Sequence, residues 1–352
     1  MREVNSLAKE LKASLGWHQA RVTLLAQFIF ALIKVRTVNL VQVAQAFSGD
    51  TSADSNYKRL QRFLRHFEID FDVVAIVISH LFCPEGKWVL SLDRTNWQLG
   101  KYKINFLVLG VVVQNVAIPI FWTTLPKKGN SNTDDRLTLM NRFLGVFGSE
   151  KIECLTADRE FKGAKWLAYL KEEKINFCIR IANNTKVWNK HRNRKLPVSR
   201  IFSLQLGEQM SIRKARSIWG VPVYLSCIRG ARGLVVIASS ESPEKAIETY
   251  RQRWAIETLF GCLKTRGFNL EATHVTDLER LKKLFLVLTI TFAWCLKVGI
   301  WITERKPIVI KKHGRQSKSI FRIGLDQLRR PMLSNQAALG LLWRYIRFLS
   351  CT

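Results

Sequence analysis

Residues 87–124 read KWVLSLDRTNWQLGKYKINFLVLGVVVQNVAIPIFWTT, and this stretch decides the fold class. Three runs of hydrophobic and β-branched residues alternate in it with short polar connections, which is typical of neighbouring strands. The pattern predicts three consecutive strands, at 87–92, 104–113 and 116–123.

The segments that follow alternate between helical and extended patterns. The periodicity predicts a helix over 134–147, a strand over 152–156, a helix over 163–174 and a strand over 175–181. Three neighbouring strands followed by alternating elements indicate a mixed sheet with helices packed on it, which is the α/β class.

The chain is strongly basic. It has 352 residues and a formal net charge of +29 at pH 7, which excludes an acidic or neutral housekeeping enzyme. A hydrophobic fraction of 47% supplies a full core, so the charge belongs to a folded protein. Such a surplus requires a polyanionic partner, either nucleic acid or an anionic membrane.

Cysteine usage and the N-terminal pattern bear on compartment. The seven cysteines form no C-x-x-C pair, which favours reduced thiols over disulfides or a zinc site. The first fifteen residues have no signal-peptide pattern, so we expect a cytoplasmic protein.

Both ends of the chain read as helical. The segment 55–67 carries Lys58, Arg59 and Arg62, which suit phosphate contact, although a solvated helix face is an equal alternative. The apolar run 284–296 is short for a membrane span and is followed by Lys297, so a buried core helix is the favoured interpretation.

The middle of the chain is a basic segment rich in short strands. Residues 180–232 contain twelve basic residues and one acidic residue. Turn residues separate three expected strands, at 211–216, 221–228 and 233–238. A pattern without a breaker then predicts one long helix over 243–266.

This predicted helix carries Tyr250, Arg253, Glu257 and Lys264 at offsets of 0, 3, 7 and 14. At about 100° per residue the four fall within an arc of about 60°, so they share one stripe. A surface ion-pair stripe is the simpler alternative, since Arg253 and Glu257 are spaced i, i+4.

The combination of three acidic residues favours chemistry. Asp93 and Asp158 each end a predicted strand, and Glu257 lies on the stripe. Three carboxylates on a basic α/β chain suit two divalent cations, which hold attacking and leaving oxygens around a phosphodiester. Phosphoryl transfer is therefore the predicted reaction class. Glu160 could compete as a metal carboxylate.

The motifs resemble those of DDE transposases of bacterial insertion sequences, specifically the insertion-sequence-four family with its Tyr-x2-Arg-x3-Glu-x6-Lys signature. Tyr250, Arg253, Glu257 and Lys264 match that signature at every spacing. Asp93 and Asp158 lie in Leu-Asp-Arg-Thr-Asn-Trp and Ala-Asp-Arg-Glu-Phe contexts like those of the family. The resemblance covers about residues 87–280.

The resemblance implies an RNase H-like mixed-sheet core with a β insertion, flanked by helical regions. The expected boundaries are a helical DNA-binding region at 1–85, a core at 86–181 resumed by the catalytic helix at 241–280, the basic insertion at 182–240 and a C-terminal helical region at 281–352. Asp93, Asp158 and Glu257 would be the catalytic residues and would bind two Mg2+ ions, for which Mn2+ substitutes.

The resemblance also implies a reaction and its partners. Cut-and-paste transposition would begin with a nick at the element's end, continue through a hairpin and finish with strand transfer. A homodimer would pair two inverted terminal repeats and join them to target double-stranded DNA, in the nucleoid of a bacterium or archaeon and without a membrane. Tyr250, Arg253 and Lys264 would grip phosphates beside the cleaved end.

The insertion offers further DNA contacts. Arg213, Lys214 and Arg216 are expected to contact DNA, and Trp219 is the candidate for stacking on a flipped base, with Trp188 as the second choice. A packing role for Trp219 is the simpler alternative.

Three other readings stay open from the residues alone. A non-catalytic DNA-binding repressor of transposition would fit the charge, and a structure-selective nuclease would share the core. A membrane protein rests only on residues 284–302.

Overall fold

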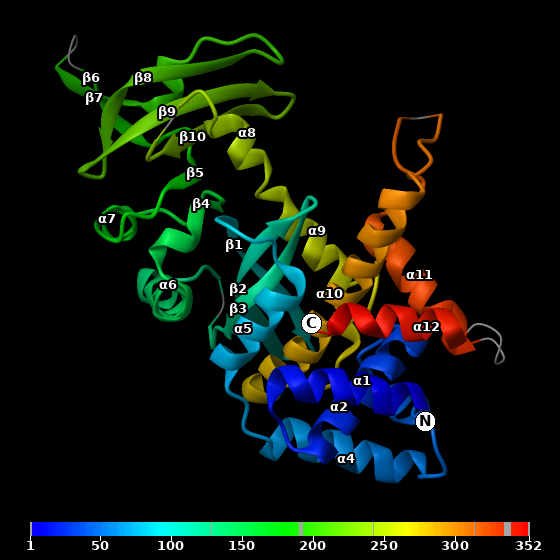
Figure 1. Ribbon diagram of the computed structural model, residues 1–352. Coiled ribbons are helices and arrows are strands. Elements are labelled where there is room, and N and C mark those ends of the chain that lie inside the picture. The colour runs from blue at the N-terminus through cyan, green and yellow to red at the C-terminus, as the bar shows by residue number, and fades with distance from the viewer. Residues whose placement is uncertain are drawn as a thin grey trace. The chain divides into compact units, whose positions relative to one another are not determined.

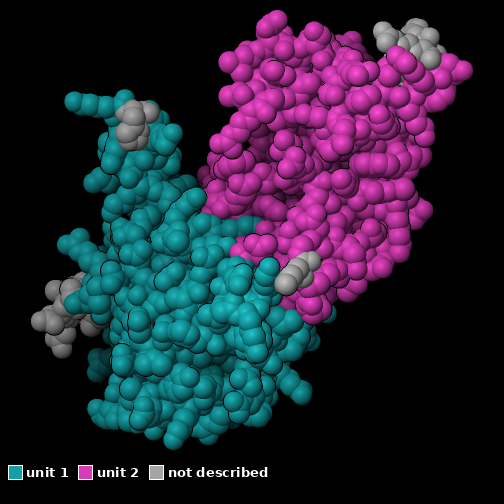
Figure 2. Space-filling view, turned by 180° about the vertical axis from the view of Figure 1, so that it is seen from behind, with its two compact units in different colours: residues 1–83, 97–104, 259–352 teal, residues 84–96, 105–258 magenta. Residues whose placement is uncertain are grey.

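A computed structural model describes residues 2–127, 129–189, 193–241, 243–312, 314–333 and 339–350. The chain forms two compact units, shown in different colours in Figure 2. The helical unit comprises residues 1–83, 97–104 and 259–352, and the sheet unit comprises residues 84–96 and 105–258.

An eight-stranded mixed sheet, in the order β3-β2-β1-β4-β5-β10-β9-β8, organises the sheet unit (Figure 1). β1, β4 and β5 are parallel, whereas β3 pairs antiparallel with β2 and β10 pairs antiparallel with both β5 and β9. The predicted mixed α/β class is confirmed, and the first five strands have the RNase H-like order. The strands are β1 (Trp88–Leu99), β2 (Tyr102–Val113), β3 (Val116–Thr124), β4 (Ile152–Ala157), β5 (Phe177–Ile181), β8 (Gln209–Ile218), β9 (Val221–Gly230) and β10 (Gly233–Ser239).

Helices pack on this sheet through aromatic and aliphatic side chains. The ring of Phe143 on α6 lies 6.3 Å from the rings of both Trp88 and Phe121, edge to face. Buried Ile247 of α8 packs against the thiols of Cys154 and Cys178 on adjacent strands. The elements of this unit outside the sheet are α6 (Thr133–Phe147), η1 (Ser149–Lys151), α7 (Ala164–Glu172), η2 (Val198–Ile201), α8 (Ala246–Arg251) and the start of α9 (Trp254–Leu263).

The basic segment is continuous with the core sheet. β10 pairs with β5 through Ile237 and Arg180, so the predicted strands of the segment extend the sheet as β8, β9 and β10. The sequence missed a second, two-stranded sheet, made of β6 (Lys186–Asn189) and β7 (Arg194–Pro197).

The first predicted strand was too short. β1 continues through Asp93 to Leu99, because the strand pairs with β2 far beyond the hydrophobic run that marks it in the sequence. Asp93 therefore lies within a strand, whereas Asp158 directly follows β4.

The single long helix predicted over 243–266 was wrong. α8 ends at Arg251 and α9 begins at Trp254, and the backbone N–H of Arg253 bonds the carbonyl of Tyr250, three residues back. The Ser91 hydroxyl donates to the Arg253 carbonyl at 3.3 Å, so a contact from β1 holds the break. The four signature residues consequently do not form a stripe on one helix.

Helices make up most of the other unit. The predicted helix at 55–67 corresponds to an observed helix whose ends are shifted by up to two residues, with Ser52 as its N-terminal cap. The elements are α1 (Arg2–Leu15), α2 (Gln19–Val35), α3 (Leu40–Gln45), α4 (Ala53–His66), α5 (Phe71–Phe82), η3 (Leu270–Ala272), α10 (Leu278–Arg305), α11 (Ile320–Leu333), α12 (Leu339–Ile346) and η5 (Arg347–Leu349).

α10 is the central helix of this unit. By length and composition it is the one described helix that could cross a membrane, but 78% of its most apolar window is buried. The Lys297 ammonium donates to the carbonyls of Leu81 and Phe348, both at 2.7 Å, which compensates for the burial of its charge. α11 crosses α10 closely at Gly299 and Gly324, where a side chain would collide with the facing backbone.

Candidate active site

Asp93 and Asp158 are neighbours because β1 and β4 run parallel. Leu92 of β1 pairs with Ala157 of β4, and each of these two residues is followed by an aspartate. Asp93 is mostly buried, with 16% of its side chain exposed, and its Oδ1 accepts a 2.7 Å bond from the Arg94 backbone N–H. Two strands distant in sequence thus carry their carboxylates to one end of the sheet.

Arg253 joins Asp93 to Glu257. Its Nη1 lies 3.3 Å from Asp93 Oδ2, and its Nη2 lies 2.6 Å from Glu257 Oε1. The guanidinium is only 6% exposed, and its Nε is buried with no hydrogen-bond partner among the described residues. The break between α8 and α9 makes this geometry possible, because it turns Arg253 toward β1.

Asp158 has its own polar partners. The Tyr250 hydroxyl donates to Asp158 Oδ1 at 3.4 Å, and a guanidinium nitrogen of Arg180 lies 3.8 Å from the same oxygen. Burial raises the pKa of Tyr250 to about 12, so its hydroxyl keeps its proton at neutral pH. The tyrosine therefore acts here as a hydrogen-bond donor.

The cluster strongly perturbs Asp93. Burial raises the pKa of Asp93 to about 7, and the nearby carboxylates of Glu160 and Asp158 add to the rise. The Arg94 N–H and the Arg253 guanidinium oppose it without cancelling it. Burial is therefore the dominant influence on the Asp93 carboxyl group.

A supporting pair was missed by the sequence reasoning. Arg94 donates to both oxygens of Glu160, from Nε at 2.9 Å and from Nη2 at 3.1 Å, and also bonds Asn105. Both carboxylate oxygens of Glu160 are therefore engaged. The signal was present as opposite charges next to the two aspartates, one residue after Asp93 and two after Asp158.

Residues 84–296 match the sequence model of the transposase DDE domain, which is well over half of the chain. The chain belongs to the DDE transposase family. No curated protein matches it. Among solved structures, the cryo-EM structure of piggyBac transposase synaptic complex with hairpin DNA is similar, with 12% identity, 99% of this chain and 79% of that chain covered, and a TM-score of 0.49.

DDE transposase domains generally depend on divalent metals, and the donor chemistry of this transposase fits them. Asp93, Asp158 and Glu257 offer hard oxygen donors, which is the ligand type that such ions prefer. No group of three or more acidic, His or Cys side chains among the described residues is arranged to hold a metal ion. Arg253 instead engages two of the three carboxylates.

Lys264, the fourth residue of the predicted signature, follows α9 and belongs to the helical unit. Its Nζ pairs with Glu271 Oε1 at 2.9 Å and lies 5.9 Å from the centre of the Trp97 ring. These contacts orient the ammonium within its own unit.

Trp219 and Trp188 line one hollow of about 820 Å3 in the transposase's sheet unit. Trp219 forms the β8–β9 turn with Gly220 at φ values of 51° and 84°, a conformation that a bulky residue rarely adopts. Trp188 is 44% exposed. The hollow is also lined by basic and polar residues: Lys162, Asn184, Thr185, Lys186, Lys195 and Ser217.

The other basic residues predicted to contact DNA differ in exposure. Arg213 and Lys214 are exposed on β8, and Arg216 is half-buried. Arg213 lies near Glu244, at 3.7 Å, but 88% of its side chain is in solvent.

On α4 of the transposase, Lys58 and Arg62 are exposed, whereas Arg59 points inward. Its guanidinium donates to Gln27 Oε1 at 3.1 Å and to Asn56 Oδ1 at 3.2 Å. Arg59 thus stabilises the packing of α4 on α2.

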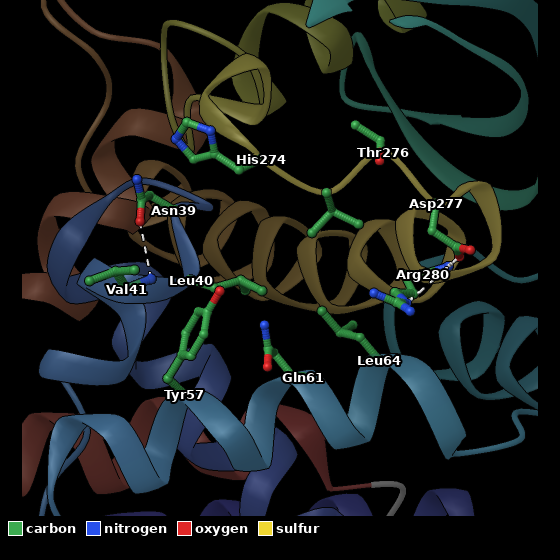
Figure 3. A pocket seen from close by; sticks show the side chains of 11 residues that line it. Asn39, Leu40, Val41, Tyr57, Gln61, Leu64, His274, Thr276, Asp277 and Arg280 are labelled. Atoms are coloured by element: carbon green, nitrogen blue, oxygen red, sulfur yellow. Dashed lines mark hydrogen bonds and ion pairs between the residues drawn. The ribbon is translucent and has the colours of Figure 1, made fainter.

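A small pocket of about 170 Å3 lies beside this helix (Figure 3). The side chains of Tyr57 and Gln61 on α4 point toward it, and His274 lies on the loop opposite them.

Trp254 was not singled out by its sequence. Its indole is 64% exposed, and the Arg253 guanidinium lies 5.4 Å from the centre of its ring. An exposed tryptophan beside Arg253 presents a flat apolar surface next to the candidate site.

Proposed function

We propose that this chain is a metal-dependent DNA transposase of the insertion-sequence-four type, which excises and inserts its element by cut-and-paste transposition. The observation that carries the proposal is the Arg253 bridge between Asp93 and Glu257, with Asp158 beside Asp93 through the β1–β4 register. The signature spacing and the acidic motifs meet there in three dimensions.

Asp93, Asp158 and Glu257 are the proposed ligands of two Mg2+ ions, with Mn2+ as a substitute. The ions would supply Lewis-acid activation of the attacking oxygen and neutralise charge on the leaving oxygen. Glu160 is not among the proposed ligands, because Arg94 holds both of its oxygens.

The remaining signature residues position DNA. Tyr250 donates a hydrogen bond, and Arg253 and Lys264 carry positive charge toward phosphates beside the cleaved end. The buried Nε of Arg253 has no hydrogen-bond partner among the described residues, and an unsatisfied buried donor of this kind supports a functional role for Arg253.

Aromatic side chains would hold unstacked bases. Trp219 and Trp188 face one basic hollow, which suits a base flipped from the duplex near the element's end. Arg213, Lys214 and Arg216 would continue the phosphate contacts along β8, and Lys58 and Arg62 would contact the terminal repeat from α4.

The proposed reaction nicks one strand at each inverted terminal repeat, passes through a hairpin and joins the reopened 3′ ends to target DNA. Two ends require two subunits, so the working form is a homodimer. The domain boundaries expected above are kept as proposals, with the protein acting in the nucleoid of a bacterium or archaeon.

The test uses purified full-length protein and labelled duplexes that span the DNA immediately beside its coding sequence. Strands are resolved on denaturing gels with Mg2+ or with EDTA, for the wild type and for Asp158→Asn. We expect metal-dependent nicks followed by hairpins, and neither product from the variant.

Asp134→Asn is the matched control, because Asp134 is an exposed aspartate of the same unit that pairs with Lys165 on the surface. Binding without cleavage would favour a repressor, and cleavage of branched duplexes in preference to these ends would favour a structure-selective nuclease. Cleavage by Asp158→Asn would show that the carboxylate assignment is wrong.

A further inference from the structure

A two-stranded arm connects α10 to α11 in the helical unit. The backbone N–H of Ser317 bonds the Val309 carbonyl and that of Lys311 bonds the Arg315 carbonyl, both at 2.9 Å. Ile310 and Gln316 form an antiparallel bridge between the two strands. In Figure 1 the arm is the orange loop that extends beyond the ends of both helices.

The arm carries aliphatic side chains that are exposed to solvent. Val309 is 67% exposed and Ile310 is 59% exposed, and the described residues around them from 304 to 319 are exposed apart from half-buried Ile308. A lone hairpin without a core is marginally stable, and exposed apolar side chains on it gain nothing until a partner covers them.

The charges of the arm divide between its base and its tip. At the base, the Arg305 guanidinium lies 4.0 Å from the centre of the Trp301 ring, and Lys318 pairs with Asp326 at 2.8 Å. Toward the tip, Lys311 and Lys312 are exposed, and their ammonium groups have no ion pair or hydrogen bond with any described residue. No acidic residue occurs between 305 and 319.

We propose that residues 305–312 and 314–319 form a DNA-binding arm that enters the major groove of duplex DNA. A two-stranded ribbon fits that groove, which is about 12 Å wide. Lys311 and Lys312 contact phosphates, while Val309 and Ile310 pack against base edges such as thymine methyl groups. The inference rests on the proposed function and adds a DNA contact that the signature residues do not supply.

The test measures equilibrium binding of a fluorescent duplex to the full chain in EDTA, across a series of salt concentrations. The variant K311E/K312E is compared with K171E/K174E, a pair of exposed lysines at the end of α7 and just after it, which gives the same charge change outside every proposed DNA contact. Each lost phosphate contact lowers the salt slope by about 0.9. We expect the arm variant to lose about 2 units of slope and the α7 variant to retain the wild-type slope.

A second variant tests the apolar contact. V309S/I310S is expected to weaken duplex binding severalfold at a constant salt slope, because it removes no charge. Thermal unfolding of all variants checks that the fold is intact, and the exposure of these positions predicts unchanged melting.

The outcomes separate the inference from the function on which it rests. A wild-type protein that binds no duplex would overturn the proposed function itself. Wild-type binding with an unchanged salt slope in K311E/K312E would overturn only the arm. Binding of the same variant to phosphatidylserine vesicles is measured in parallel. If K311E/K312E loses vesicle binding but binds DNA like the wild type, the arm is likewise not a DNA contact.

Discussion

Replacing Asp93 with asparagine is expected to stabilise the metal-free protein at alkaline pH. The pKa of Asp93 is raised from 3.8 to about 7, chiefly by burial. Between these values the folded state binds a proton that the unfolded state lacks, so stability falls as pH rises. The contribution of protonated Asp93 to the free energy of unfolding is fully present below about pH 4 and is lost as the pH rises through about 7.

The size of the effect follows from the same shift. One pKa unit corresponds to about 1.4 kcal/mol, so ionised Asp93 costs the metal-free fold about 4 kcal/mol at pH 8. Asparagine has the same shape and no proton to lose. The free energy of unfolding of Asp93→Asn minus that of the wild type should therefore increase by about 2.5 kcal/mol between pH 5 and pH 8.

Urea unfolding followed by circular dichroism in EDTA measures this difference. Asp134→Asn is the control, because Asp134 is exposed and Lys165 lowers its pKa, so it does not titrate between pH 5 and pH 8. If the free energy of unfolding of Asp93→Asn minus that of the wild type stays constant between pH 5 and pH 8, the reasoning is refuted. A variant less stable than the wild type at pH 8 would refute it as well.

Three further predictions concern neighbouring features. Arg253→Ala should bind Mn2+ about tenfold more tightly in electron paramagnetic resonance titrations, because the guanidinium that engages two carboxylates is removed. Equal or weaker binding would contradict this, and so would the same gain in the control variant Arg251→Ala. Trp254→Ala should lose about 1–3 kcal/mol of affinity for a terminal duplex in anisotropy titrations in EDTA, since base stacking is of that size; unchanged affinity would exclude the contact. Gly324→Ala should lower the free energy of unfolding by at least about 2 kcal/mol through collision with the α10 backbone, whereas Gly145→Ala, which meets no atom, should leave it unchanged or slightly raised.

Strand and helix identities followed from local patterns, because each depends on residues a few positions apart. The three hydrophobic runs within 87–124 and the later alternation correctly predicted the mixed sheet and its first five strands. The buried interpretation of the apolar run now within α10 agrees with its packing. The joining of β10 to β5 was not predictable in this way, because pairing between distant strands leaves no local pattern.

At the candidate site the sequence supplied the residue types and their spacing, and the resemblance supplied their proposed roles. It did not predict that β1 continues past Asp93, that the helix breaks at Arg253, or that Arg94 and Glu160 pair beside the carboxylates. These features depend on contacts such as that between Ser91 and the Arg253 carbonyl.

The amino-acid sequence by itself determined the basic charge, the order of the elements and the chemical groups available for phosphoryl transfer. The tertiary structure decided which of those groups meet. Asp93 and Asp158 adjoin through strand register, and Arg253 reaches Asp93 only because the helical hydrogen-bond pattern is interrupted there. The reason is physical: propensity and periodicity act over one or two turns of chain, whereas the site is assembled by packing between segments more than sixty residues apart.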